Sequence, residues 1–290
     1  MLNKAQIAIK TIYISIIGNF LLAVVKATSG IYGNSYALVA DSLESCVDVF
    51  ASLIALIALR YAAKPPDEDH PYGHGKIEPL ITFLTVLFLV STATIIAHQS
   101  IINIQEPHEP PKTFTLFVLG IIIIGKEIFY RVLTKKGNET DSSLLKAEAW
   151  HHRADSLTSG AAFIGILVAV IFGEKYAAAD DWAALFASAI IYYNSFLIFR
   201  PAFGEIMDEN LYDDLILKIR KIAKENPRVV DTEKCFVRKT GMYYFVDLHL
   251  IVSGKISVKE GHEISHEVKK EIITKEKDII DVLIHIEPDE

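Results

Sequence analysis

Long apolar stretches separated by short polar segments make up the chain from about residue 6 to about residue 203. A helix of about 20 mostly apolar residues crosses a bilayer core about 30 Å thick. The pattern therefore predicts a transmembrane domain over residues 1–205, built as an all-α bundle of six helices. The expected helices cover residues 7–29, 36–62, 77–103, 112–134, 142–172 and 177–202.

The pattern changes at about Asp208 to the periods of a soluble α+β domain, expected over residues 206–290. Residues 211–225 and 257–275 have apolar positions at helical spacing. Short runs rich in β-branched and aromatic residues predict strands, and Thr240–Gly241 predicts a tight turn between the first two. The expected strands cover residues 234–239, 243–252 and 282–286.

Basic residues are concentrated in the connections on one side of the predicted bundle. An excess of lysine and arginine marks the cytoplasmic side of a membrane protein. The opposite connections are rich in glycine and serine (Ser29 to Ser35) or acidic (Glu106, Glu109, Glu174, Asp180, Asp181). We therefore expect both termini in the cytoplasm. The basic residues are Lys4, Lys10, Arg60, Lys64, Lys76, Arg131, Lys135, Lys136 and Arg200.

Composition narrows the possible functions. Hydrophobic residues make up 51% of the 290 residues, which is high for a soluble protein. The net charge of −7 and the absence of a basic stripe argue against nucleic-acid binding. The two cysteines form no CxxC pair, and the sequence contains neither a phosphate-binding loop nor an evident nucleophile–base pair. We therefore expect no enzyme.

Two predicted helices carry ionisable residues, which are costly inside a membrane and usually functional. Glu44 and Asp48 are four residues apart, and so are His151 and Asp155, which places each pair on one helix face. Together they offer three carboxylates and one imidazole, a set that suits a tetrahedral divalent metal. Alternatively, neighbouring bases neutralise these acids, and Arg153 is the close candidate recognised in the sequence. One base cannot balance three acids, so we favour the metal site.

Two further clusters lie outside the predicted helices. Asp67, His70 and His74 occupy a loop containing glycine and proline, where they either bind a metal or form a solvated polar turn. The soluble region has four histidines and an acid that could share a metal, although scattered surface histidines would look the same. These residues are His249, His262, His266, His285 and Glu287.

The chain resembles the cation diffusion facilitator family, especially its bacterial zinc and iron efflux members. The resemblance covers nearly the whole chain. It rests on Ala-Asp-Ser-x-x-Ser-x-x-Asp at 40–48, His-Pro-Tyr-Gly-His-Gly-Lys-x-Glu at 70–78, His-x-x-x-Asp at 151–155 and Val-Leu-Ile-His-Ile-Glu-Pro at 282–288. The motif at 70–78 is the most specific of the four.

The resemblance implies a homodimer whose subunits combine the six-helix bundle with a ferredoxin-like, metallochaperone-like cytoplasmic domain. It implies a multi-pass protein of the cell inner (cytoplasmic) membrane. It also implies a charge interlock between Lys76 and Asp208. Glu233 stands where some relatives carry a histidine. The implied ligands are Glu44, Asp48, His151 and Asp155 (transport site), Asp67, His70 and His74 (loop site), and His249, His262, His285 and Glu287 (cytoplasmic site).

The expected function is a secondary transporter that exports divalent transition metals, above all Zn²⁺, from the cytoplasm in exchange for protons. Zn²⁺ is then the substrate and a regulatory ligand, and the lipid bilayer and a second copy of the chain are the other partners. Glu44 is one methylene longer than the usual ligand, which leaves Mn²⁺, Fe²⁺ or Cd²⁺ as alternative cargo. A metal-gated channel and a metal sensor are the competing classes.

Overall fold

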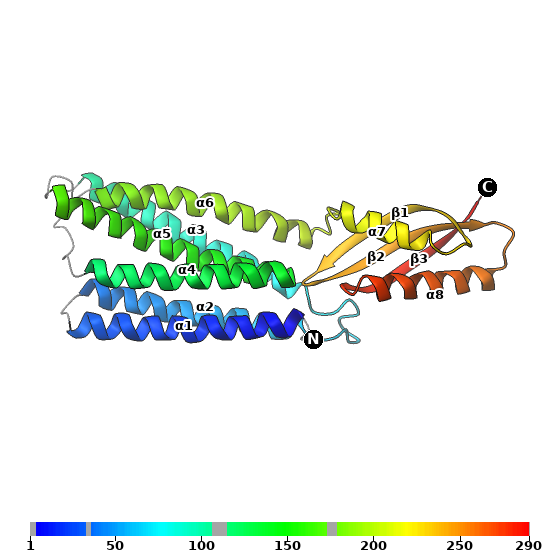
Figure 1. Ribbon diagram of the computed structural model, residues 1–290, viewed down its shortest axis with the longest axis horizontal. Helices are drawn as coiled ribbons and strands as arrows, with labels where there is room; N and C mark the ends of the chain where they lie inside the picture. The colour runs from blue at the N-terminus through cyan, green and yellow to red at the C-terminus, as the bar shows by residue number, and fades with distance from the viewer. Residues whose placement is uncertain (1–3, 33–35, 106–114, 173–178, 290) are drawn as a thin grey trace. The chain divides into compact units, whose positions relative to one another are not determined.

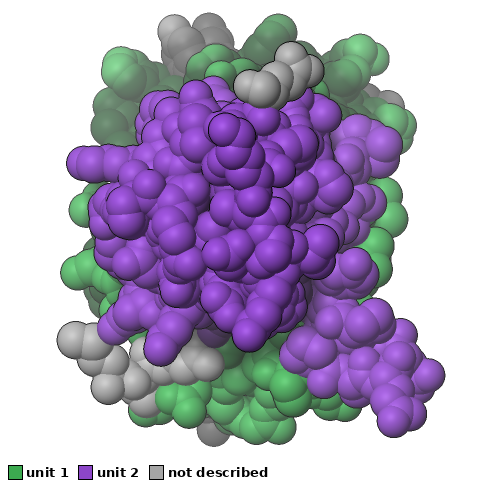
Figure 2. Space-filling model, turned by 90° about the vertical axis from the view of Figure 1, so that its right-hand side faces the viewer, with its two compact units in different colours: residues 1–65, 77–202 green, residues 66–76, 203–290 purple. Residues whose placement is uncertain are grey.

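The computed structural model describes residues 4–32, 36–105, 115–172 and 179–289, so the acidic connections at 106–109 and 174 lie outside the described residues. The chain divides into two compact units. One contains residues 1–65 and 77–202, and the other contains residues 66–76 and 203–290, as Figure 2 shows in colour. The loop at 66–76 thus belongs with the C-terminal unit, whereas the sequence placed it inside the domain over 1–205.

Long helices build the first unit, and Figure 1 shows them side by side. α1 packs along α2, α4 packs along α5, and α1 also contacts α4, whereas α2 and α3 contact α5. At Gly18 an added Cβ would overlap the ring of Phe129, so the glycine lets α1 approach α4 closely. The helices are α1 (Lys4–Tyr32), α2 (Tyr36–Ala62), α3 (Ile77–Gln105), α4 (Thr115–Thr140), α5 (Ser143–Phe172) and α6 (Ala179–Ile206).

This unit exposes many large apolar side chains and buries several polar and ionisable ones beside its apolar core. Large apolar side chains such as Ile57, Ile95 and Phe117 are exposed, whereas Lys126 and Glu148 are buried. Apolar residues face outward where lipid replaces water. By length and composition, the segments Lys4–Thr28 of α1 and Ile77–Gln105 of α3 are apolar enough to cross a membrane. That all of α1 to α6 cross it stays a prediction.

A buried acid at the start of α3 fixes the beginning of α5. Glu78 Oε1 accepts hydrogen bonds from the Leu144 N–H, at 3.2 Å, and from the Ser142 hydroxyl. The first N–H groups of a helix lack partners within the helix, and a carboxylate satisfies them and suits the positive end of the helix dipole. This contact sets where α5 begins and therefore where its later turns place His151 and Asp155.

The second unit contains a three-stranded sheet with strand order β1-β2-β3. β1 (Val229–Thr240) and β2 (Tyr243–Ser253) are antiparallel, and β3 (Ile279–Asp289) runs parallel to β2. Gly241, at φ +63°, makes the expected turn between β1 and β2. A parallel neighbour needs a crossover connection, and α8 (Val258–Lys275) provides it. The α+β prediction for this region is therefore confirmed.

The core of the second unit lies between the sheet and its two helices, α7 (Asp213–Ala223) and α8. Alternate residues of β2 are buried, and so are α8 residues three to four positions apart, as these two periods require. A capping box starts α8: Ser257 Oγ accepts from the Glu260 N–H at 3.2 Å, and Glu260 accepts from the Ser257 N–H at 2.7 Å.

Candidate metal sites

Asp48 of α2 meets His151 and Asp155 of α5 inside the first unit. Asp48 Oδ1 lies 2.8 Å from His151 Nε2, which in turn lies 4.0 Å from Asp155 Oδ2. The three ligand atoms all lie within 4.8 Å of one another. Asp48 is buried, and the other two are half-buried. Two carboxylates and an imidazole at this spacing can converge on one metal ion.

The fourth expected ligand, Glu44, lies one helical turn before Asp48 on α2, but its side chain is outside the described part of the structure. The same holds for Asp41. The role of Glu44 therefore stays a prediction.

A cavity of about 270 Å³ opens beside the three ligands, between α2, α3 and α5. Asp48, His151 and Asp155 line it together with Glu148, and apolar residues of α3, among them Phe88, form another part of the wall. A hydrated ion therefore has room to approach the ligands.

Lys126 of α4 is a base that the sequence analysis missed. Its Nζ donates to Asp48 Oδ2 at 2.9 Å and to Asp155 Oδ2 at 2.7 Å, and the side chain is buried. The base considered from the sequence, Arg153, instead pairs with Glu127 and lies over the Tyr130 ring. The signal was present in the sequence: Lys126 follows four isoleucines and a glycine, and an ionisable residue in such a run is usually functional.

A buried hydrogen-bonded chain continues from Lys126. Asn19 Oδ1 accepts from Lys126 Nζ at 3.3 Å, and Asn19 Nδ2 donates to Ser52 Oγ at 3.3 Å. The Ser52 hydroxyl donates to Glu148 Oε1, to which the Ser15 hydroxyl also donates at 3.4 Å. The sequence analysis did not single out Asn19, Ser52 or Glu148.

His152, which directly follows His151, is directed to a different partner. Its Nε2 lies 2.8 Å from Ser15 Oγ, and its ring stacks on Phe129 with centroids 5.4 Å apart. Among the described residues, the group of candidate ligands at this place consists of Asp48, His151 and Asp155. His152 therefore lies outside it.

The loop cluster brings together all three residues that the sequence proposed for it. Asp67 Oδ1 lies 3.0 Å from His70 Nδ1, and Asp67 Oδ2 lies 3.3 Å from His74 Nε2. Asp67 and His70 are exposed, whereas His74 is buried. Desolvation acts to raise the pKa of Asp67, but hydrogen bonds from the His70 backbone and ring hold it below its ordinary value of 3.8. The carboxylate is therefore ionised and ready to bind a cation at neutral pH.

The expected charge interlock is present as a contact within the second unit. Lys76 Nζ donates to Asp208 Oδ1 at 2.7 Å and to the Glu205 carbonyl at 2.5 Å. Asp208 has φ +52°, in the left-handed region that Asp and Asn adopt more readily than other side chains. The lysine therefore ties the loop to the segment that ends α6.

The C-terminal cluster contains three of the four expected ligands. His249 of β2 and His285 of β3 are paired in register, with ring centroids 4.8 Å apart. Glu287 Oε1 lies 2.5 Å from His249 Nδ1 and 3.9 Å from His285 Nε2. The hydrogen bond with His249 lowers the pKa of Glu287. Glu233 Oε2 lies 3.9 Å from His249 Nδ1, so this residue is at the edge of the cluster.

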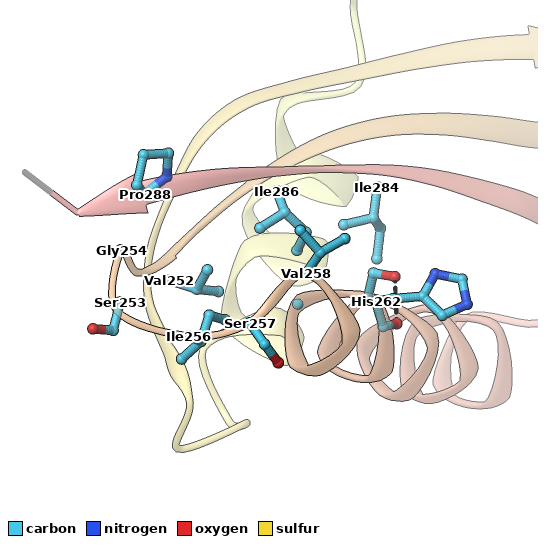
Figure 3. A pocket seen from close by; sticks show the side chains of 12 residues that line it. Val252, Ser253, Gly254, Ile256, Ser257, Val258, His262, Ile284, Ile286 and Pro288 are labelled. Atoms are coloured by element: carbon cyan, nitrogen blue, oxygen red, sulfur yellow. Dashed lines mark hydrogen bonds between the residues drawn. The ribbon is translucent and has the colours of Figure 1, made fainter.

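His262 lies apart from that cluster within the single chain. Figure 3 shows it on α8, beside a pocket of about 420 Å³ to which Val258, Ile284 and Ile286 also contribute. Its nearest aromatic partner is His266, with ring centroids 4.4 Å apart. A role for His262 at an interface between two chains stays a prediction.

Comparisons with known proteins cover nearly the whole chain. Residues 12–207 match the family described as "Cation efflux transmembrane domain", and residues 211–289 match "Cation efflux protein, cytoplasmic domain". The manganese efflux system protein MneP of Bacillus subtilis is 32% identical over 99% of this chain and 98% of its own length. The cation-efflux pump FieF of Shewanella oneidensis is 28% identical over 92% of this chain and 89% of its own length.

Proposed function

The chain belongs to the cation diffusion facilitator family of metal efflux transporters, and from this premise we propose that it exports Zn²⁺ from the cytoplasm in exchange for protons. The chain is an integral membrane protein for divalent metal cation efflux and is not an enzyme. We propose which metal is carried, which ion is exchanged for it, which residues bind it and how two copies assemble.

The observation that carries the proposal is the convergence of Asp48, His151 and Asp155 inside the helix bundle. Carboxylate oxygens with one imidazole suit Zn²⁺, Mn²⁺ or Fe²⁺ better than Cu⁺, which prefers sulfur ligands. Glu44, one turn before Asp48, would complete a four-ligand site. Such a site lies among helices that can rock to face the two sides of the membrane in turn.

Proton exchange follows from the chemistry of the ligands. A metal binds deprotonated carboxylate and neutral imidazole, so its arrival displaces protons and its departure lets them return. If the site opens alternately to each side, an inward proton gradient drives metal outward. The same ligands would then carry metal in one direction and protons in the other.

Mn²⁺ is the second candidate cargo. A relative that spans nearly the whole chain is named as a manganese efflux protein. Glu44 would also give a longer and more adaptable ligand than Asp at this position. Fe²⁺ and Cd²⁺ remain further alternatives on the same ligand chemistry.

The two clusters of the second unit would bind metal in a regulatory role, in a homodimer held in the inner membrane with both termini in the cytoplasm. His285 and Glu287 are exposed or half-exposed on β3, so a cation can reach them. Acidic groups repel across a two-fold interface when it is empty, and a bound cation removes that repulsion. Metal in the cytoplasm would then draw the two copies together.

Reconstituted vesicles containing a zinc-sensitive dye test the proposal. With purified protein, zinc flux should rise when a proton gradient is imposed in the opposite direction, and accumulation of zinc against its own gradient should stop when the proton gradient is collapsed. Flux that is indifferent to protons would favour a channel, and binding without flux would favour a sensor. Competition among Zn²⁺, Mn²⁺, Fe²⁺ and Cd²⁺ in the same vesicles identifies the preferred cargo.

A further inference from the structure

We propose that Lys126 is a tethered cation that occupies the transport site while the site is empty and must leave it when the metal arrives. This inference rests on the proposed function, because it concerns the same three ligands. It adds a residue from a third helix, α4, to a site otherwise built from α2 and α5.

The position of Lys126 is that of a counter-ion shared by both acidic ligands. Its Nζ lies 2.9 Å from Asp48 Oδ2 and 2.7 Å from Asp155 Oδ2, and 1% of the side chain is exposed. The two carboxylate oxygens of Asp48 have different partners: Oδ1 faces His151, and Oδ2 faces Lys126. The ammonium therefore bridges the two carboxylates that a metal would bridge.

The metal and the ammonium exclude one another from this place. A divalent ion binds carboxylate oxygens at about 2.0–2.2 Å, so it would compete with Lys126 for the carboxylates of Asp48 and Asp155. Two cations of charge +2 and +1 within a few ångströms repel strongly in a medium of low dielectric constant. Metal binding therefore requires the lysine side chain to move away.

A second set of polar groups, beginning with Asn19, lies within reach of the Lys126 ammonium. Asn19 Oδ1 already accepts from it at 3.3 Å, and the hydrogen-bonded chain continues through Ser52 to the buried carboxylate of Glu148. A lysine side chain is flexible and has three donors, so it can exchange acceptors without leaving the bundle. Glu148 Oε1 is the acceptor at the far end of this chain.

The exchange has a consequence for the transport cycle. Two carboxylates buried in a membrane bundle without a counter-charge are strongly disfavoured. While Lys126 bridges them, the two carboxylates have a counter-charge in the carrier without metal. The same bridge lowers the apparent affinity for metal, because only the fraction of molecules with a displaced lysine can bind it.

Lys126→Met tests the inference, since it removes the charge and keeps a long side chain. Zn²⁺ binding is measured by calorimetry on the purified full chain, in a common background with His70→Ala and His285→Ala so that the transport site dominates. We expect the dissociation constant for Zn²⁺ to fall by about tenfold or more, because the competing cation is gone. Export by the same variant should slow, since the empty carrier loses its counter-charge.

The matched control is Lys136→Met, the same change on the same helix, where Lys136 pairs with Glu139 outside the site. Its Zn²⁺ affinity should equal that of the background protein. Lys126→Arg keeps the positive charge and should not show the gain in affinity. If Lys126 had only a structural role, its replacement would weaken metal binding. Tighter binding in Lys126→Met therefore separates a competing cation from a structural residue.

A second variant keeps the inference testable if Lys126→Met does not fold. Asn19→Leu removes the amide oxygen toward which the displaced ammonium moves, so Zn²⁺ should bind about tenfold more weakly although every proposed ligand is intact. Zinc affinity that is unchanged or weaker in Lys126→Met, or unchanged in Asn19→Leu, overturns the inference. If the background protein with Lys126 intact neither binds nor exports Zn²⁺ or Mn²⁺, the proposed function itself fails.

Discussion

Asp155 combines two contacts on one carboxylate, since its Oδ2 lies 2.7 Å from Lys126 Nζ and 4.0 Å from His151 Nε2. Asp155→Asn keeps the shape of the side chain and removes its charge. We expect metal export to fall by a factor on the order of 100 or more, because a ligand and half of the counter-charge for Lys126 disappear together. Flux into reconstituted vesicles measures the loss.

Asp214→Asn, an equivalent change at an exposed position of α7, controls for the substitution itself and should leave flux unchanged. The elution volume of the purified protein should be the same for both variants and the wild type. Normal zinc flux through Asp155→Asn would show that the site has been assigned to the wrong residues.

The residues of the proposed transport site could be predicted only in part from the sequence. Asp48, His151 and Asp155 were found because helical spacing places each pair on one face, and the structure brings these three together. Lys126 was missed because its partners lie 78 and 29 positions away in the chain, on other helices. Periodicity within one helix says nothing about which neighbour packs against it.

At the scale of elements, we expect the capping box of α8 to stabilise the first turn of that helix. Replacing Ser257 by alanine removes the acceptor for the Glu260 N–H. We expect the free energy for opening the first turn of α8 to fall by about 1 kcal/mol. Hydrogen exchange of this segment in the full chain measures the effect. Ser265→Ala is the control, because that hydroxyl only bonds back to the His262 carbonyl within the helix.

The contribution of Glu260 to this cap depends on pH in a defined direction. The hydrogen bond from the Ser257 backbone lowers the pKa of Glu260 below its ordinary value of 4.5. A carboxylate with a lowered pKa in the folded state stabilises the fold above its unfolded pKa and loses this effect as pH falls through the folded value. The protection that distinguishes wild type from Glu260→Ala should therefore be full at pH 7 and shrink below pH 4.5. An equal difference at every pH would contradict this account.

Strands were harder to delimit than helices for a physical reason. The expected first strand, 234–239, lies inside β1, which begins at Val229. Register shifts between Val229 and Asp231, and between Thr232 and Cys235, break the alternation of buried and exposed residues there. A bulge changes which face the next residue occupies, so the period of two cannot be followed through it. The pairing of β3 with β2 also depends on contacts that no single segment reveals.

At the scale of the whole molecule, the pair formed by Lys76 and Asp208 is expected to matter for transport more than for stability. Both side chains are more than a third exposed, and such pairs usually contribute less than about 1 kcal/mol. We therefore expect Lys76→Met to change the melting temperature little. We expect it to slow zinc flux, because the loop at 66–76 loses its ion pair with Asp208. Asp208→Asn should do the same, since Asn also tolerates the positive φ at this position.

The double variant provides the decisive comparison. If the contact between the two charges is what matters, flux through the double variant should be no lower than through the slower single variant. Fully additive losses would mean that each residue acts on its own.

His285→Ala tests the assembly of two copies. We expect the variant to need about tenfold more Zn²⁺ to dimerise, because one ligand of the C-terminal cluster is lost. The transport ligands are untouched, so flux at saturating metal should remain. Mass photometry across a zinc titration measures the shift, with His98→Ala on α3 as the control outside every candidate cluster. A dimer that forms equally well in both variants, with or without zinc, would make this cluster irrelevant to assembly.

The missing side chain at Gly75 has a consequence for how the C-terminal unit responds to a ligand. A Cβ at this position would lie 2.6 Å from the Thr240 carbonyl oxygen, so the loop rests directly on the backbone at the end of β1. His74, the buried histidine of the loop, is the adjacent residue. We therefore expect an ion bound by this histidine to change the surroundings of the turn between β1 and β2. Metal binding in residues 66–76 would then be felt at the end of β1, because the loop and the strand are in direct contact at Gly75.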